Sequence, residues 1–444
     1  MREVDLLIEA GWVIPVEPHG VALAKHAVVI HEGRIVDLLP IETALVGYLP
    51  RSRVQRPDCI LLPGFVNAHA HNPMSLMRGL ADDLPLMTWL QGHIWPVEAA
   101  VLGADFVRDG TELAIVEMLR GGTTCANENY FFPDVSADTY HRHGFRACVG
   151  LPIIDFPTPW ARSDDEYFER ALAVHDEWRG HPLIGCAFTP HAPYTVKDAS
   201  FERIALLARQ LNLQVHCHVH ETAQEVSDSL QQYRQRPLAR LQRLDLVNEQ
   251  LMAVHMTQLT PAEIELCAQQ GVSVVHCPES NLKLASGFCP AAALQKAGVN
   301  LALGTDGCAS NNDLDMLGEM RTAALLAKGV ALDAAALDAP SALRMATLGS
   351  ARAMALDEQI GSIEVGKQAD LITLRLDVPE MQPLYDPISQ LVYAGARQNV
   401  RDVWIAGERK LVDGELVDID VTEVLAKARQ WGQRIACLPR RPSG

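Results

Sequence analysis

The stretch QVHCHVHE at residues 214–221 alternates apolar and polar side chains with a strict period of two. This period predicts a β-strand, because successive side chains of a strand point to opposite faces. The valines and the cysteine would share one face, and His216, His218 and His220 the other. A buried row of imidazoles needs partners, since an unsatisfied buried polar group is costly. The stretch therefore predicts an inner strand with a polar face. We assign His216 to structure and leave the role of His220 open.

Seven further runs with strand character flank this one, and helix-like stretches such as 113–119, 201–211 and 314–327 separate them. The eight candidate strands lie near residues 60–66, 121–126, 146–154, 183–189, 212–219, 251–256, 272–277 and 299–304. Repeated strand and helix units of this number predict an α/β fold with a (β/α)8 TIM-like barrel. Counting alone is also consistent with a doubly wound open sheet.

Both ends of the chain have a different texture from the middle. Short alternating runs broken by glycines occupy residues 1–62 and return from residue 366 onward. Each piece is too small to be stable alone, so we expect the two ends to pair into one small β-sandwich. The predicted organisation is the N-terminal part of the sandwich at 1–62, the barrel at 63–365 and the C-terminal part of the sandwich at 366–444.

The composition is that of an ordinary globular protein, with 444 residues, 48% hydrophobic and 21% charged. A net charge of −17 leaves little positive surface for a phosphate backbone, so we expect no nucleic-acid partner. No apolar stretch is long enough to span a membrane, and no signal peptide is evident. The ten cysteines form no CxxC pair. We therefore expect a soluble, unprocessed, cytoplasmic protein without a membrane partner, and a homo-oligomer is one option.

Polar side chains stand where most of the predicted strands end. They are His69 and His71 for the first strand, His191 for the fourth, His218 for the fifth, His255 for the sixth, His276 for the seventh and Asp306 for the eighth. Barrel enzymes build their sites at the carboxyl ends of the strands, so these side chains should converge. Three imidazoles and a carboxylate with one position open are typical of a catalytic divalent metal site, with zinc the first choice and iron or manganese as alternatives. We assign His276 to structure.

Several motifs resemble the amidohydrolase superfamily in its chlorohydrolase and nucleoside-deaminase branch. They are PGFVNAHAH at 63–71, HVHE at 218–221 with His218 and Glu221 as its matching residues, the single residue His255, and Gly304-Thr305-Asp306. Further motifs are similar to the deaminases of 5′-methylthioadenosine and S-adenosylhomocysteine within that branch. These are Trp89-Leu90, HIWPVE at 93–98, HAPY at 191–194 and NLKLASG at 281–287. The resemblance covers nearly the whole chain.

The resemblance implies a set of roles. One divalent metal, zinc first, would be held by His69, His71, His218 and Asp306. Catalysis would rest on Glu221, His255 and Asp306, and the substrate would contact Glu98, His191, Glu221 and Asp306. The implied reaction is the hydrolytic deamination of 5′-methylthioadenosine, or of S-adenosylhomocysteine or adenosine, to the inosine analogue and ammonia. The residue types suit these roles, since Asp306 can take a proton from water, Glu221 can protonate a ring nitrogen and His255 can stabilise charge.

Other hypotheses use the same residues. A deaminase or dechlorinase of another aromatic heterocycle, such as guanine, cytosine or a triazine, would share the metal chemistry. A catalytically dead barrel acting as a binding scaffold would be expected to lose Glu221, His255 or Asp306, and all three are present. Glu221 could instead be a solvated residue at a helix start, and Glu98 an exposed residue of an amphipathic helix.

Two segments bear on the metal count and on the substrate. The predicted fourth strand, IGCAFTP at 184–190, lacks the lysine that bridges two metals in binuclear amidohydrolases, so we expect one metal. Relatives that accept S-adenosylhomocysteine are expected to place arginine after the third strand, because a guanidinium binds a carboxylate bidentately. Residues 148–157 read CVGLPIIDFP, and the next arginine is Arg162. We therefore expect a preference for 5′-methylthioadenosine.

Overall fold

The computed structural model describes residues 1–438, which divide into two compact units. The first unit contains Met1–Asn67, Val116–Cys125 and Asp315–Ile419, and the second contains Ala68–Ile115, Ala126–Leu314 and the chain from Asp420 onward. Residues 439–444, the last of the predicted C-terminal sandwich part, lie outside the described residues. The predicted boundaries after residues 62 and 365 stay a prediction.

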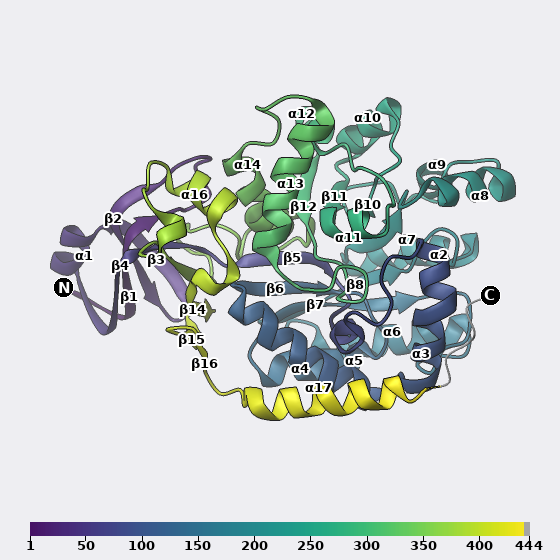
Figure 1. Cartoon of the computed structure of the whole chain (residues 1–444), viewed down its shortest axis with the longest axis horizontal. Helices are drawn as coiled ribbons and strands as arrows, with labels where there is room; N and C mark the ends of the chain where they lie inside the picture. The colour runs from purple at the N-terminus through teal and green to yellow at the C-terminus, as the bar shows by residue number, and fades with distance from the viewer. Residues whose placement is uncertain (439–444) are drawn as a thin grey trace. The chain divides into compact units, whose positions relative to one another are not determined.

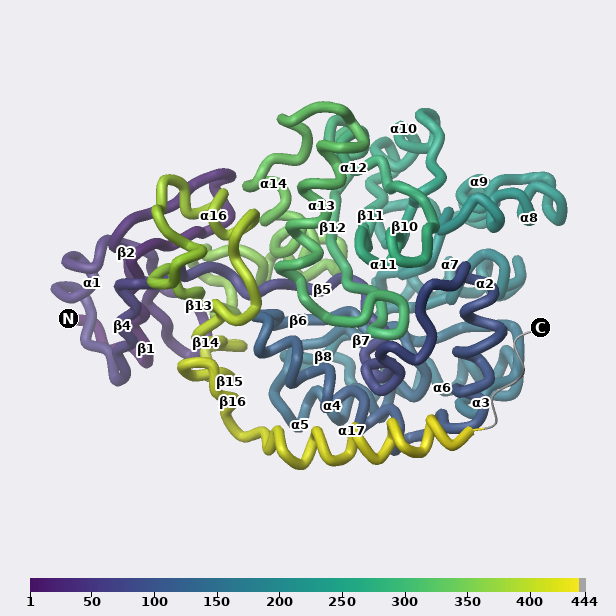
Figure 2. Tube along the Cα trace, in the orientation of Figure 1, coloured from purple at the N-terminus to yellow at the C-terminus, as the bar shows by residue number. Residues whose placement is uncertain are grey.

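The first unit is built on a sheet that joins strands within residues 2–63 to strands within residues 371–416, and the purple and yellow-green parts of the trace lie together there (Figure 2). Its order is β16-β15-β14-β13-β4-β1-β2-β3. The bounds are Arg2–Val13 (β1), Leu23–His31 (β2), Arg34–Pro40 (β3), Tyr48–Pro63 (β4), Leu371–Arg375 (β13), Val400–Ile405 (β14), Glu408–Val412 (β15) and Glu415–Leu416 (β16). Leu6 and Ile8 pack in one core cluster and Leu7 in another, so β1 is covered on both faces. The predicted β domain from both chain ends is confirmed, and its strands form one hydrogen-bonded sheet.

Helices of the first unit lie between these strands and after the last barrel strand. They are α1 (Ile41–Gly47), α13 (Met316–Ala331), α14 (Ala339–Arg344), the π-helix η3 (Met345–Gly349), α15 (Ser350–Ala353), η4 (Pro379–Met381), α16 (Pro387–Ala394) and η5 (Arg397–Asn399). Asp386 illustrates why one of them begins where it does: its side chain accepts hydrogen bonds from the first backbone amides of α16.

The second sheet is the barrel, with its strands in chain order from β5 to β12 (Figure 1). They run over Phe65–Ala70 (β5), Thr123–Glu128 (β6), Arg146–Ile153 (β7), Ile184–Pro190 (β8), Val215–Val219 (β9), Leu251–His255 (β10), Ser273–His276 (β11) and Asn300–Leu303 (β12). The amide of Asp306, just after β12, donates to the carbonyl of His69 in β5 at 3.0 Å, which joins the last strand to the first. The predicted TIM-like barrel is confirmed.

Seven of the eight predicted strands match a barrel strand within three residues at either end in the described chain. The first is displaced: residues 60–63 belong to β4 of the other sheet, and the barrel strand β5 begins at Phe65. Gly64 marks the change of sheet, because a Cβ there would lie 2.1 Å from the Thr124 hydroxyl oxygen. One apolar run therefore supplies two strands, which periodicity alone does not separate.

Helices follow the barrel strands and cover the outside of the sheet (Figure 1). They are α4 (Ala104–Arg120), α5 (Pro133–Arg142), α6 (Asp164–Trp178), α7 (Asp198–Leu211), α8 (Ala223–Tyr233), α9 (Pro237–Arg243), α10 (Pro261–Gln270), α11 (Pro278–Lys283) and α12 (Ala291–Lys296). A longer excursion between β5 and α4 holds η1 (Asn72–Met77), α2 (Leu86–Trp89), the π-helix η2 (Leu90–Ile94) and α3 (Trp95–Val101).

Residues 421–436, within the predicted C-terminal sandwich part, form the helix α17 (Val421–Ala436) of the second unit. Figure 1 shows this helix, in yellow, alongside α4. The Trp431 indole donates to Asp109 at 2.9 Å, and the Lys427 ammonium lies 3.1 Å from Glu112. Its apolar face thus has a partner in the barrel helices. None of the helices in residues 1–438 is both long and apolar enough to cross a membrane.

Candidate active site

Four side chains that can bind a metal meet at the carboxyl ends of barrel strands. His69 lies in β5 and His71 just after it, His218 lies in β9, and Asp306 follows β12. One potential ligand atom from each lies within 4.8 Å of the others, a spacing that one divalent ion can span. No other group of three or more His, Cys, Asp or Glu within residues 1–438 meets this spacing. The chain thus offers one site that can hold a metal ion.

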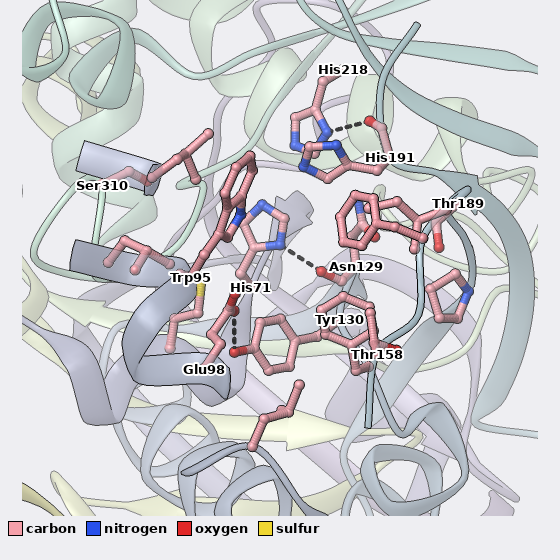
Figure 3. Close-up of a pocket in the computed structure, with 18 of the residues that line it drawn as sticks. His71, Trp95, Glu98, Asn129, Tyr130, Thr158, Thr189, His191, His218 and Ser310 are labelled. Atoms are coloured by element: carbon pink, nitrogen blue, oxygen red, sulfur yellow. Dashed lines mark hydrogen bonds between the residues drawn. The ribbon is translucent and has the colours of Figure 1, made fainter. Parts of the chain in front are cut away.

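Hydrogen bonds at the far ring nitrogens orient these histidines. The Nδ1 of His71 donates to the carbonyl of Asn129, and the Nδ1 of His218 donates to the carbonyl of His191 at 2.6 Å (Figure 3). Because a carbonyl only accepts, each Nδ1 carries the proton and each Nε2 keeps its lone pair for a metal. The Nδ1 of His69 lies 3.0 Å from the Nε2 of His216, so His216 orients the ring of His69.

Charge in this cluster is arranged around Asp306. Its Oδ1 lies 3.0 Å from the Nε2 of His69 and 3.2 Å from that of His71. Burial alone would raise the pKa of Asp306, but its contacts with these two imidazoles hold it well below its usual value. Burial lowers the pKa of His69 to about 4, whereas Asp306 raises that of His71 against the effect of burial. A neutral imidazole is the form that a metal requires.

Two hydroxyls hold the other oxygen of Asp306. Ser280 donates to Oδ2 at 2.6 Å and Ser310 at 2.8 Å. The backbone of Asp306 has a φ of 59°, and that of His255 has a φ of 72°, a left-handed conformation that residues other than glycine adopt rarely. Such positions are concentrated where the surrounding structure places a side chain for function.

Glu221 and His255 face the same cluster. Burial, followed by the charge of Asp306, raises the pKa of Glu221 to about 8. The Nε2 of His255 lies 3.9 Å from the Oε1 of Glu221, and its Nδ1 meets the Oδ1 of Asn281 at 2.8 Å. Glu221 is buried and Thr222 caps α8, so Glu221 is not a solvated residue at a helix start. The Glu225 carboxylate accepts from the Glu221 amide at 2.7 Å and fixes the backbone there.

These groups open into a cavity of about 320 Å³. The base of the cavity, which we define as His71, His218, Glu221, His255 and Asp306, is polar. The wall, which we define as the lining residues within 86–102 and 152–159, is largely apolar. Across it, the rings of Trp95 and Phe156 pack edge to face with centroids 6.4 Å apart. The cavity can therefore take a molecule with a polar, reactive end and an apolar remainder.

Glu98 and His191 both line the cavity. Glu98 lies on α3, and burial raises its pKa to about 7 while a hydrogen bond from the Tyr130 hydroxyl, at 2.6 Å, acts in the opposite direction. His191 follows β8, and burial lowers its pKa to about 4. Glu98 therefore faces the cavity rather than solvent, and His191 offers a neutral ring that can donate or accept a hydrogen bond.

The wall carries no positive charge: among the described residues, those that line the cavity include no lysine or arginine. Asp155, the acid of the segment after the third strand, accepts from the Ser200 hydroxyl at 2.9 Å at the start of α7. Arg162 is exposed and does not line the cavity.

The structure also shows where His220 and His276 lie. The Nε2 of His220 accepts from the Leu238 amide at 3.0 Å, which ties His220 to the start of α9 rather than to the cavity. His276 is buried, and its carbonyl accepts from the Gly304 amide at 3.0 Å. Sequence reasoning missed other residues around the cluster, namely Asn129, Tyr130, Ser280 and Ser310, and it quoted Asn281 in a motif without giving it a role. A usable signal existed for Asn129 and Tyr130, because they follow the second barrel strand directly.

Comparison with known proteins adds a family and several relatives. The sequence profile of the amidohydrolase family matches residues 60–410. A 5-methylthioadenosine/S-adenosylhomocysteine deaminase of Teredinibacter turnerae is 48% identical over 432 residues, which cover 97% of this chain and 98% of that protein. The chain is thus similar to this protein along nearly its whole length.

Solved structures are similar as well. The crystal structure of an adenosine deaminase from Xanthomonas campestris with bound zinc has a TM-score of 0.98 and 66% identity, covering 98% of this chain and all (100%) of that one. The zinc complex of atrazine chlorohydrolase from Arthrobacter aurescens has a TM-score of 0.89 at 22% identity, covering 96% of this chain and 99% of that one. At that identity the likeness concerns the fold alone.

Proposed function

This chain belongs to the amidohydrolase family, and from that membership we propose that it is a zinc-dependent deaminase that converts 5′-methylthioadenosine to the inosine analogue and ammonia. The observation that carries the proposal is the position of Glu221, a buried carboxyl with a pKa of about 8, beside a three-histidine and one-aspartate cluster in one cavity. The relatives named above support the nucleoside as substrate.

The donor set suits zinc, which takes imidazole nitrogen and carboxylate oxygen and keeps an open position in catalytic sites. We assign His69, His71, His218 and Asp306 as its ligands. A divalent ion held there would lower the pKa of a water molecule toward neutrality and so supply the nucleophile. The proton of that water would pass to the carboxylate of Asp306, whose Oδ2 stays fixed by Ser280 and Ser310.

Glu221 would act as an acid toward the purine ring. Burial raises the pKa of Glu221 to about 8, which favours the protonated carboxyl, and in that form it can donate to the ring nitrogen beside the carbon under attack. The ring then accepts the electron pair displaced by the incoming oxygen. The Nδ1 of His255 meets the Oδ1 of Asn281, so its Nε2 would accept a hydrogen bond from the attacking water and orient it.

Collapse of that centre completes the reaction. The proton held by Asp306 would move to the amino nitrogen, the carbon–nitrogen bond would break and ammonia would leave. The proton of the new hydroxyl group would return the Glu221 carboxylate to its acid form as the carbonyl forms. The amino group of the substrate is thereby replaced by a carbonyl oxygen from water. Glu98 and His191 line the cavity, and we assign them to substrate contacts. The apolar wall around Trp95 and Phe156 suits the uncharged methylthio end.

A substrate panel tests the proposal. Zinc-loaded protein is incubated with 5′-methylthioadenosine, S-adenosylhomocysteine, adenosine, guanine, cytosine and a chlorotriazine, and release of ammonia and chloride is followed. The proposal expects the largest kcat/KM for 5′-methylthioadenosine with ammonia as product. A larger value for guanine, cytosine or the chlorotriazine would instead make the chain a deaminase or dechlorinase of another heterocycle. No turnover of any compound by metal-loaded protein would favour a binding scaffold.

We also propose a cytoplasmic location. All ten cysteines lie within the described residues, where no disulfide joins them, and eight of them are buried. Thiols outside disulfides suit a reducing compartment, and cell fractionation would test the location. A homo-oligomer stays a prediction, which sedimentation would test.

A further inference from the structure

Tyr130 connects a barrel strand to the wall of the cavity. It is the second residue after β6, and its side chain is only 5% exposed. Its hydroxyl donates to the Oε1 of Glu98 on α3 at 2.6 Å (Figure 3). A buried phenol needs such an acceptor, and a bond to a carboxylate is stronger than one between neutral groups. The contact therefore fixes both side chains in place.

Glu98 needs this support because of where it lies. It belongs to the excursion between β5 and α4, outside the regular strand and helix units of the barrel. Its helix α3 follows directly on the π-helix η2, a type of turn often found at functional sites. A functional side chain on such a segment keeps its geometry only when a second group holds it.

The segment that carries Tyr130 is itself rigidly anchored. The amide of Asn129 donates to the carbonyl of Ala70 in β5 at 2.9 Å, and the carbonyl of Asn129 accepts from His71. The ring of Tyr130 packs in the same hydrophobic cluster as Trp89 and Ile94. Asn129 thus orients the candidate metal ligand His71, and the next residue, Tyr130, orients the wall carboxylate of Glu98. Because the two are consecutive in the chain, they fix the wall carboxylate relative to the metal cluster.

We propose that Tyr130 is a positioning residue for substrate selection: it holds Oε1 of Glu98 so that Oε2 receives hydrogen bonds from the sugar hydroxyls of the nucleoside. This rests on the proposed function, which supplies a substrate with two neighbouring hydroxyls. A carboxylate accepts such a pair well only when its plane is fixed. Without the phenol, Glu98 can rotate and the substrate must order it on binding.

The test compares nucleosides with and without sugar hydroxyls. Tyr130→Phe in the full-length, zinc-loaded chain should raise KM for 5′-methylthioadenosine about tenfold, as expected from about 1.4 kcal/mol of lost charge-assisted bonding. Its kcat should stay within about threefold of the parent. For the 2′,3′-dideoxy analogue, KM should be the same in parent and variant. Zinc content should also be unchanged.

Two further variants test whether Tyr130 acts through Glu98. Glu98→Gln should likewise lose the discrimination, which is the difference in KM between 5′-methylthioadenosine and its 2′,3′-dideoxy analogue. Tyr130→Phe combined with Glu98→Gln should have the same KM as Glu98→Gln alone, because both changes act through one contact. Should Tyr130→Phe not fold, Glu98→Asp, which draws the carboxylate back from the phenol, must lose the discrimination. Tyr48→Phe is the matched control, since that hydroxyl also donates to a carboxylate, Asp37 at 2.8 Å, in the first unit.

The outcomes separate the two proposals. If the parent deaminates 5′-methylthioadenosine but Tyr130→Phe leaves KM and the discrimination unchanged, the positioning role is overturned while the function stands. A fall in kcat with loss of zinc would also overturn it, because Tyr130 would then act on the metal cluster. If the parent turns over no nucleoside, both proposals fail.

Discussion

The base and the wall of the cavity are built in opposite ways. The base consists of side chains at the ends of barrel strands, held by hydrogen bonds to neighbouring backbone and side chains, as in His71, His218 and Asp306. The wall comes from the excursion at 86–102 and from 152–159, which is the end of β7 and the loop after it, and it offers mostly apolar surface. Polar, preorganised groups suit chemistry, and apolar surface suits selection among substrates.

Changes in the base and in the wall should therefore have different effects on turnover. A change in the base should alter turnover for every substrate, because each substrate meets the same polar groups. A change in the wall should alter the ratio between substrates, because only the part remote from the reacting carbon differs. Experiments on each part test whether turnover depends on the base and selection on the wall.

Metal removal should have the largest effect on the base. Chelation should abolish turnover, because His69, His71, His218 and Asp306 then have no ion to present to water. One equivalent of zinc per chain should restore it, and a second should add nothing. Metal analysis combined with activity titration checks this. Two metals per active chain, or turnover by the metal-free chain, would contradict the account.

Glu221→Gln should have the next largest effect. The amide cannot transfer a proton to the ring nitrogen, so kcat should fall by about 10²–10⁴ while zinc content is unchanged. Glu265→Gln, at an exposed position of α10, is the matched control and should behave as the parent. If Glu221→Gln turned over like the parent, the acid would have to be another group.

The wall should produce a smaller effect, on selection. The carboxylate of S-adenosylhomocysteine finds no lysine or arginine among the described residues that line the cavity. Its kcat/KM should therefore be at least about tenfold below that of 5′-methylthioadenosine, which corresponds to about 1.4 kcal/mol of missing charge-assisted bonding. Steady-state kinetics with both substrates checks this. Equal values would mean that the wall does not read the charge of the tail.

The smallest effect concerns the support behind the wall. Trp431 and Ile435 of α17 pack in the same hydrophobic cluster as Trp89 and Leu90. On the same helix, Lys427 pairs with Glu112. A hydrogen bond that Glu112 accepts from His143, and then one from Lys427, lower the pKa of Glu112 to about 2, although burial opposes this. A carboxyl with a lowered folded-state pKa stabilises the fold above its unfolded pKa of about 4.3, and this contribution is lost as pH falls toward 2.

Glu112→Gln should therefore lower Tm at pH 7, by about 1 °C for each kcal/mol lost in a chain of 444 residues. The difference from the parent should shrink between pH 5 and pH 2. Thermal unfolding at a series of pH values, with Glu265→Gln as control, measures it. A difference that stays constant down to pH 2 would show that the Glu112 charge is not the cause.

The base could be predicted from the sequence far better than the wall. Strand periodicity and strand ends located His69, His71, His218, His255 and Asp306, because both follow from backbone geometry. The partners of these residues depend on contacts between distant segments, such as Ser280 with Asp306, that no local pattern encodes. The facing of Trp95 and Phe156 likewise depends on loop conformation. In the first barrel strand, one apolar run served two sheets, which the period of two does not reveal.

One measurement tests the division between base and wall most directly: kcat/KM for 5′-methylthioadenosine and for S-adenosylhomocysteine in the parent, in Glu221→Gln and in Phe156→Arg. Phe156 lines the cavity yet is 41% exposed, so an arginine there can reach the tail of the substrate without entering the core. The account predicts that Glu221→Gln lowers both values by the same factor and keeps their ratio, whereas Phe156→Arg shifts the ratio toward S-adenosylhomocysteine by about tenfold. A ratio that changes in Glu221→Gln and stays fixed in Phe156→Arg would contradict it.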